Sequence, residues 1–197
     1  MRAVFACLLT ALLCACAGAP TQTAAPVSPA VAAGATASTV KPLAAGERVE
    51  AFLAAYKALV FRGLPNADQA AVLAEHFSPA LNGLMHDALA GQQAYKARYP
   101  SDKPPMIDGD VFSSLFEGAS SGTVDAVDVA ADTAIVRVKY VYSDPETGKA
   151  IETWPDRFLL VREGSNWLID DIEYLGGWDF APKGKLSQAL HETAALH

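Results

Sequence analysis

Cysteine is missing from most of the chain. The three cysteines, Cys7, Cys14 and Cys16, all lie within the first 16 of the 197 residues. Residues 17–197 therefore cannot form a disulfide bond, supply a thiolate nucleophile or bind a metal ion through cysteine. A domain without disulfides depends on its hydrophobic core, and about 150 residues are enough to build one.

Basic residues are few and form no run. The chain has 15 lysine and arginine residues against 22 aspartate and glutamate residues, which gives a net charge of −7. Loss of residues 1–16 would remove one arginine and leave a charge of −8 if the new amino end is acylated. Nucleic acid is not an expected partner, because binding it requires a positively charged surface. A cationic partner is compatible with this charge.

The motifs of common enzymes are also missing. The sequence has no Gly-x-Ser-x-Gly motif, no phosphate-binding loop and no dinucleotide-binding fingerprint. The chain has four histidines, His76, His86, His191 and His197. Their spacing does not match a metal-binding helix pattern such as His-Glu-x-x-His. We therefore expect ordinary surface histidines, no metal site and no cofactor.

Residues 1–16 carry the apolar run of the chain. Arg2 precedes a run that is too short to span a bilayer as a stable helix, and small residues follow it. This order is typical of a secretory signal peptide. The Leu-Cys-Ala-Cys sequence at 13–16 resembles a bacterial lipobox with Cys16 as the lipid acceptor. The alternative is an ordinary leader that is cleaved near residues 17–19.

An acylated Cys16 would hold the protein to a membrane, because each buried methylene contributes about 0.8 kcal/mol. By resemblance to lipoprotein sorting, Ala17 after the acceptor implies the inner leaflet of the outer membrane, facing the periplasm. Residues 17–45 are rich in Ala, Thr, Pro, Ser, Val and Gly and almost uncharged, which predicts a flexible tether. Residues 46–197 are predicted to form a single domain.

The first part of this domain has a helical period. Apolar residues from Val49 to Val60 recur three or four positions apart, which predicts an amphipathic helix of about four turns. A short helix is expected over 67–77. A third helix starts at Pro79 and fades between residues 91 and 99, since Ser78 is a suitable N-cap before a proline.

The period changes to two after residue 122, and this predicts strands. Four strands are expected at about 123–129, 135–142, 151–162 and 167–174, followed by a helix at 185–195. Residues 101–121 form an irregular, apolar-rich loop that should pack over the domain. The order predicts an α+β fold, in which helices pack on one face of a curved, cone-shaped, four-stranded antiparallel meander.

This arrangement, with a last strand that reads Trp-Leu-Ile-Asp-Asp-Ile at 167–172, resembles the nuclear-transport-factor-2-like (cystatin-like) superfold. With the leader and the Ile-Asp-Gly-Asp-Val-Phe segment at 107–112, the chain also resembles bacterial lipoproteins of the domain-of-unknown-function 3828 family. The resemblance covers residues 47 to about 180. It implies a cone with a pocket and names no activity, because the superfold hosts isomerases, dehydratases, binders and interaction modules.

The last strand carries the most suggestive acid. If its side chains alternate strictly, one face carries Leu168, Asp170, Ile172 and Tyr174. Asp170 beside Tyr140 or Tyr142 could then shuttle protons. The structural alternative, which we favour, is that Asp170 accepts hydrogen bonds from the backbone or a tyrosine.

Other residues are weaker ligand candidates. Asp108 and Asp110, with Asp170 and Asp171, could hold a hard cation, but Asp-Gly-Asp is primarily a turn signal. Aromatic residues could line a pocket or pack in the core, and they are Phe112, Tyr140, Tyr142, Trp154, Tyr174 and Trp178. Trp178, after two glycines, is expected at the rim.

We therefore predict a lipid-anchored envelope protein whose domain is not an enzyme and binds a small apolar ligand or another envelope protein. One alternative is an immunity or inhibitor protein whose acidic surface blocks a cationic toxin or cell-wall hydrolase. The other is an enzyme of the isomerase or hydrolase type that uses Asp170 with a tyrosine.

Overall fold

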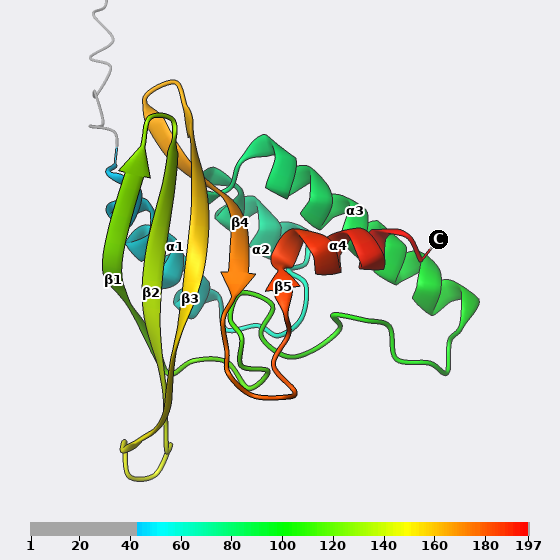
Figure 1. Cartoon of the computed structure of the whole chain (residues 1–197). Coiled ribbons are helices and arrows are strands. Elements are labelled where there is room, and N and C mark those ends of the chain that lie inside the picture. The colour runs from blue at the N-terminus through cyan, green and yellow to red at the C-terminus, as the bar shows by residue number, and fades with distance from the viewer. Residues whose placement is uncertain (1–42, 197) are drawn as a thin grey trace, which may run out of the picture. The chain divides into compact units, whose positions relative to one another are not determined.

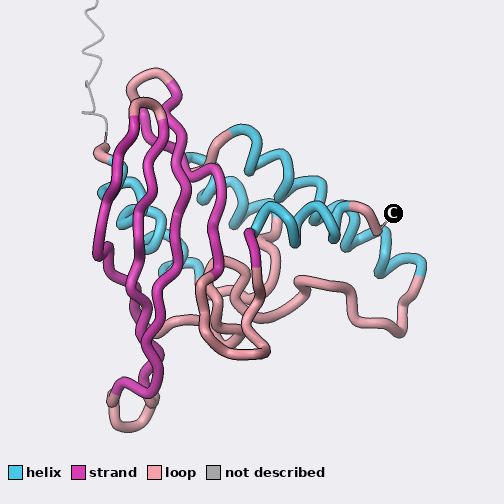
Figure 2. The backbone as a smooth tube through the Cα atoms, viewed as in Figure 1, coloured by secondary structure: helices cyan, strands magenta, loops and turns pink. Residues whose placement is uncertain are grey.

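We describe the protein from a computed structural model, which defines residues 43–196 (Figures 1 and 2). The helices are α1 (Ala45–Leu59), α2 (Ala67–Leu73), the 3-10 turn η1 (Ala74–His76), α3 (Pro79–Arg98) and α4 (Leu186–Ala194). The strands are β1 (Ser121–Ala130), β2 (Thr133–Ser143), β3 (Ala150–Glu163), β4 (Asn166–Tyr174) and β5 (Gly184–Lys185). The predicted α+β class is confirmed.

The strands form one open antiparallel sheet in the order β1-β2-β3-β4-β5. The predicted meander is therefore present, but the prediction of four strands is wrong. The fifth strand, β5, has two residues that pair with the end of β4, and two residues are too few to show a period of two. Helix α1 covers one face of the sheet and α2 packs on α1, while α3 lies beside β4 and α4 packs against α3 and β4 (Figure 1).

The core lies between these helices and the sheet. Val136, Val138 and Phe158 point inward from β2 and β3 and are fully buried, as alternation predicts. Phe52 of α1 lies at the centre, with its ring 5.3 Å from that of Phe112 and 5.7 Å from that of Phe158. The helices and the sheet therefore share one apolar core.

The segment between α3 and β1 packs into this core, as predicted for the apolar-rich loop. Val111 and Phe112 are buried, and the Tyr174 hydroxyl donates to the Val111 carbonyl at 2.6 Å. The amide of Asp110 also donates to the Phe116 carbonyl at 2.9 Å. Packing and hydrogen bonds therefore hold this loop against the core.

The prediction that side chains alternate strictly between the two faces of β4 is wrong. Ile169 pairs with Leu160 and Asp171 pairs with Leu159, so Asp170 is an extra residue between two paired positions. Such a β-bulge shifts the side chains that follow it to the other face. As a result Ile169 and Ile172 are both fully buried, and Asp170 does not share a regular face with Ile172.

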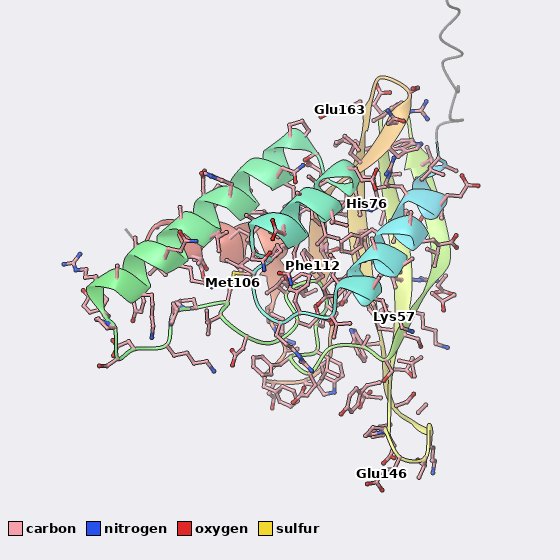
Figure 3. The ribbon with its side chains drawn as sticks, turned by 180° about the vertical axis from the view of Figure 1, so that it is seen from behind. Lys57, His76, Met106, Phe112, Glu146 and Glu163 are labelled. Atoms are coloured by element: carbon pink, nitrogen blue, oxygen red, sulfur yellow. The ribbon has the colours of Figure 1, made fainter. Side chains whose placement is uncertain are left out.

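The expectation that all histidines lie on the surface is also wrong. His76 in η1 is only 4% exposed and packs edge-on against Phe52, with ring centroids 6.1 Å apart. The short η1 turn directs the ring inward after α2 ends, and Figure 3 shows it between the helices and the sheet. Helical periodicity cannot report a turn of three residues.

The predicted signal peptide, the Cys16 attachment site and most of the tether lie outside the described residues. Helix α1 begins at Ala45, the last position of the predicted tether. None of the helices within residues 43–196 is long and apolar enough to cross a bilayer.

Candidate functional site

A groove runs beside α1, between that helix and the segment that leads into β1. It has a volume of about 330 Å³. Its lining consists of Glu50, Leu53, Ala54, Tyr56, Lys57, Asp110, Ala119, Ser120, Ser121, Gly122 and Tyr140. A second hollow of about 180 Å³ adjoins it and shares Tyr56, Lys57, Asp110 and Ala119. We call these two hollows together the α1 groove.

Helix α1 serves both the core and the groove. Val49 and Phe52 face the core and are fully buried. Glu50, Leu53 and Lys57 are spaced by three and four residues, so they form a neighbouring stripe that faces the groove. Lys57 lies near the C-terminal end of the helix (Figure 3).

A hydrogen bond between Tyr56 and Asp110 forms the polar end of the groove. The Tyr56 hydroxyl donates to Asp110 Oδ1 at 2.9 Å. The same carboxylate accepts the backbone N–H of Phe112 at 2.8 Å and the hydroxyl of Ser113 at 3.1 Å. These three donors hold the carboxylate in one orientation.

The protonation of this pair follows from its burial. Burial raises the pKa of Asp110, while the hydrogen bonds from Phe112, Tyr56 and Ser113 act in the opposite direction. Burial, with the nearby charge of Asp110, raises the pKa of Tyr56. Tyr56 therefore remains a hydrogen-bond donor at any physiological pH.

Tyr140 of β2 provides an aromatic wall. Its ring stacks on Trp154 with centroids 5.5 Å apart, and its hydroxyl lies 3.4 Å from the Phe112 carbonyl. Burial raises the pKa of Tyr140. A Cβ at Gly122 would lie 2.7 Å from this ring, so glycine is needed for the close approach of β1.

The structure thus brings two of the predicted ligand residues, Asp110 and Tyr140, into one groove. Asp170 is not part of this groove, and its Oδ1 accepts the Ser78 hydroxyl at 2.6 Å. The donor is a serine hydroxyl, whereas the structural alternative named the backbone or a tyrosine as the donor. Within residues 43–196, no three acidic or histidine side chains gather as a metal-binding group.

The remaining predicted residues lie elsewhere. Asp108 forms an exposed ion pair with Lys103, and Tyr142 is partly buried against the core. The Tyr174 hydroxyl donates a hydrogen bond to the Val111 carbonyl. Trp178 is half-buried, packed edge-on against Trp154 at 5.3 Å.

Sequence reasoning missed Tyr56 as a site residue and Asp156 as a buried acid. Asp156 is completely buried and accepts the N–H groups of Ser114 and Leu175, each at 2.8 Å. It also accepts the hydroxyl of Ser114 and the indole N–H of Trp154. Its burial could have been predicted from the sequence, because Asp156 shares one face of β3 with Trp154 and Phe158.

These contacts determine what the site can do. The oxygens of Asp110, Asp156 and Asp170 each accept hydrogen bonds from the protein itself. The exposed part of the groove offers aliphatic and tyrosine surface, with Glu50 and Lys57 at its edge. Such a surface suits binding of a small molecule that has an apolar body and a polar group.

No family model matches the chain. Over 37 residues it is 46% identical to the protein named "Uncharacterized lipoprotein YbjP" of Escherichia coli strain K12. The match covers 19% of this chain and 22% of that relative. Over this short segment the chain is similar to a bacterial lipoprotein.

Proposed function

We propose that this protein is a lipid-anchored protein of the bacterial envelope whose α+β domain binds a small ligand in the α1 groove. The groove is the observation that carries the binding role, because its hydrogen bonds fix Tyr56 and Asp110 before any ligand arrives. A preformed site binds without the cost of ordering its own side chains.

The proposed anchor rests on two observations. The sequence at 13–16 fits a lipobox. In addition, YbjP, to which a short segment of this chain is similar, is named a lipoprotein. We place the lipid on Cys16 and the protein at the inner leaflet of the outer membrane. The order of helices and meander also supports assignment of the domain to the nuclear-transport-factor-2-like class.

The anchor is tested by metabolic labelling of cells that express the full chain, with an alkyne analogue of palmitate. We expect label on the wild-type protein and on Cys14→Ser, and none on Cys16→Ser. Label that persists on Cys16→Ser, or that is absent from the wild type, would remove the lipid anchor.

The ligand chemistry follows from the groove lining. The ring of Tyr56 and the side chain of Leu53 offer an apolar surface, with the buried ring of Tyr140 behind it, and the carboxylate of Glu50 is exposed at the groove edge. A cationic nitrogen is attracted both to a carboxylate and to the face of an aromatic ring. Lys57 also lines the groove and repels a cation, so we assign to the groove a small ligand with an apolar body and a positively charged group that lies on the Glu50 side, away from Lys57.

The groove is tested with indole and tryptamine, which share one ring system and differ by an aminoethyl group that is cationic at neutral pH. Titrations of the full-length chain, made by cell-free synthesis without membranes, are followed by NMR. Tryptamine should bind about tenfold more tightly than indole. Equal affinity would show that the carboxylates do not contribute.

Two variants locate the binding. Ala54 lines the groove and Ala58 lies one turn further along α1, outside its lining. Ala54→Phe should fill the groove and abolish tryptamine binding, while Ala58→Phe should preserve it. Binding that survives Ala54→Phe would place the ligand elsewhere and defeat the proposal.

A further inference from the structure

A second cavity, distinct from the α1 groove, lies between α2 and α3. Its volume is about 230 Å³. It is lined by Pro65, Ala67, Ala70, Phe77, Asn82, Met85, His86 and Leu89. None of these residues lines the α1 groove. We call this hollow the α2–α3 cavity.

The sequence explains why space remains there. Ala67 and Ala70 are three residues apart and share the face of α2 that lines the cavity. On α3, Asn82, Met85 and Leu89 follow the helical spacing of one stripe. Two alanine side chains opposite a methionine and a leucine leave a gap that larger residues would fill.

The walls of the α2–α3 cavity are held from both sides. The Asn66 carboxamide accepts the N–H of Gln69 at 3.0 Å and fixes the start of α2. Ser78 caps α3 by accepting the N–H of Leu81 at 3.0 Å. The Asn82 amide donates to the carbonyls of Ala74 and Phe77, at 3.0 and 3.2 Å.

These hydrogen bonds hold α2 and α3 apart, because a site that cannot relax keeps its cavity. The lining also offers water few partners, since the amide nitrogen of Asn82 is already used. A water molecule at the apolar base needs two to four polar contacts, which the lining there does not supply, so a hydrocarbon group is favoured at the base.

The exposed side chain of His86 lies beside the opening, next to Asp87, with Nδ1 3.4 Å from Oδ1 of that residue. The deeper lining residues Phe77 and Met85 are buried. The α2–α3 cavity is therefore apolar at its base and polar at its mouth. This gradient fits a molecule whose apolar end enters while its polar end stays in water.

We propose that the α2–α3 cavity binds the hydrocarbon chain end of an amphipathic molecule. A cavity of about 150 Å³ accepts benzene, so one of this size accommodates on the order of nine carbon atoms. The inference stands independently of the α1 groove, because the two sites share no residue.

The test is a titration of the unacylated full-length chain with n-butanol, n-hexanol, n-octanol and n-decanol in detergent-free buffer. The chain has three methionines, so a sample with 13C-labelled methionine methyl groups gives few signals. Met85 lines the cavity and Met106 does not, and Met106 therefore serves as an internal control.

We expect the Met85 signal to shift while the Met106 signal stays in place. Affinity should rise about fourfold for each added methylene, which is the transfer free energy of that group expressed as a ratio. The rise should stop once the cavity is full. A Met85 signal that no alcohol moves would overturn the proposal.

Matched variants separate the cavity from nonspecific binding. Ala70 lines the α2–α3 cavity, whereas its neighbour Ala71 is exposed on the outer side of α2. Ala70→Phe should lower octanol affinity at least tenfold, and Ala71→Phe should leave it unchanged. Equal loss in both variants, or no loss in Ala70→Phe, would contradict the assignment.

The source of the chain end is distinguished with the acylated protein in lipid nanodiscs. If bilayer or anchor acyl chains enter the cavity, the Met85 signal already has its alcohol-bound position before any addition. If the natural molecule is a free amphiphile, the signal moves on addition of octanol. Both outcomes support the cavity as a chain-binding site.

Discussion

At the residue scale, the buried acids show how this domain uses carboxylates. Asp156 is completely buried, and burial raises its pKa. Four donors from three segments converge on its two oxygens, from Ser114, Trp154 and Leu175. One side chain thereby ties the 110–116 loop to β3 and to the end of β4.

Removal of this carboxylate should be costly, because it leaves buried N–H groups without an acceptor. We expect Asp156→Ala to lower the free energy of unfolding by about 3 kcal/mol. Urea denaturation measures the change. Asp128→Ala, at an exposed position on β1, is the control and should change stability by less than about 0.5 kcal/mol. Equal effects would show that Asp156 is not a structural hub.

His76 gives the domain a dependence on pH. Its Nδ1 lies 3.4 Å from a guanidinium nitrogen of Arg48, which can only donate, so Nδ1 accepts and Nε2 carries the proton of a neutral ring. Burial lowers the pKa of His76, the Arg48 charge lowers it further, and Glu75 acts in the opposite direction. The neutral ring is thus the form that the fold favours.

A lowered pKa in the folded state sets the sign of the effect. The stability from neutral His76 is present above about pH 6.5 and is lost as the pH falls through the folded-state value. Wild type should lose more stability between pH 7.5 and 5.0 than His76→Gln does. Urea denaturation at both pH values measures the difference.

His86→Gln, at an exposed site on α3, is the matched control and should behave like the wild type. Burial raises the pKa of both Asp110 and Asp156, so these two acids make the fold more stable as the pH falls, which is opposite to the effect of His76. Their contribution is common to all three proteins and cancels in the comparison. An unchanged pH dependence in His76→Gln would contradict the neutral, buried ring.

At the element scale, the bulge in β4 and the start of α3 depend on each other. Asp170 is the extra residue of the bulge, and its carboxylate accepts the hydroxyl of Ser78. The N–H of Ser78 donates to the Ile169 carbonyl at 2.8 Å, so backbone and side chain both join α3 to β4. Asp170 thus positions a helix against the sheet.

Ser78→Ala removes both the cap of α3 and the partner of Asp170. The loss of an N-cap serine costs about 1–2 kcal/mol. Thermal or urea denaturation should show this decrease, while Ser101→Ala, in the exposed turn after α3, should have almost no effect. A Ser78→Ala protein as stable as the wild type would rule out this joint role.

At the scale of the whole molecule, helices and sheet form one core. Phe52 of α1 contacts rings from three other segments, Phe77, Phe112 and Phe158. The first belongs to the entry of α3, the second to the packed loop and the third to β3. Neither layer retains a complete apolar core without the other.

We therefore expect a single unfolding transition for the domain. Far-ultraviolet circular dichroism reports mainly the helices, while fluorescence reports Trp154 and Trp167 on the sheet and Trp178 in the segment that follows β4. The two urea midpoints should coincide. A helical signal that disappears before the fluorescence changes would show that the layers fold separately.

Most elements of the described domain were predictable, since helices and strands follow local periods. The offsets from Val49 to Val60 predicted α1, and the alternation from Val136 to Tyr140 predicted β2 and its buried face. The polar half of the candidate site was only partly predictable. Asp110 and Tyr140 were named, but Tyr56 lies 54 residues before Asp110, and no local pattern connects them.

The sequence by itself determined the order of helices and strands, the α+β class and the absence of cysteine chemistry from the domain, because these depend on composition and on neighbours in the chain. Only the tertiary structure decided the bulge at Asp170, the burial of His76, the short strand β5 and the two cavities beside α1 and α2. Each of these depends on a partner segment distant in the sequence, whose position is set by packing of the shared core.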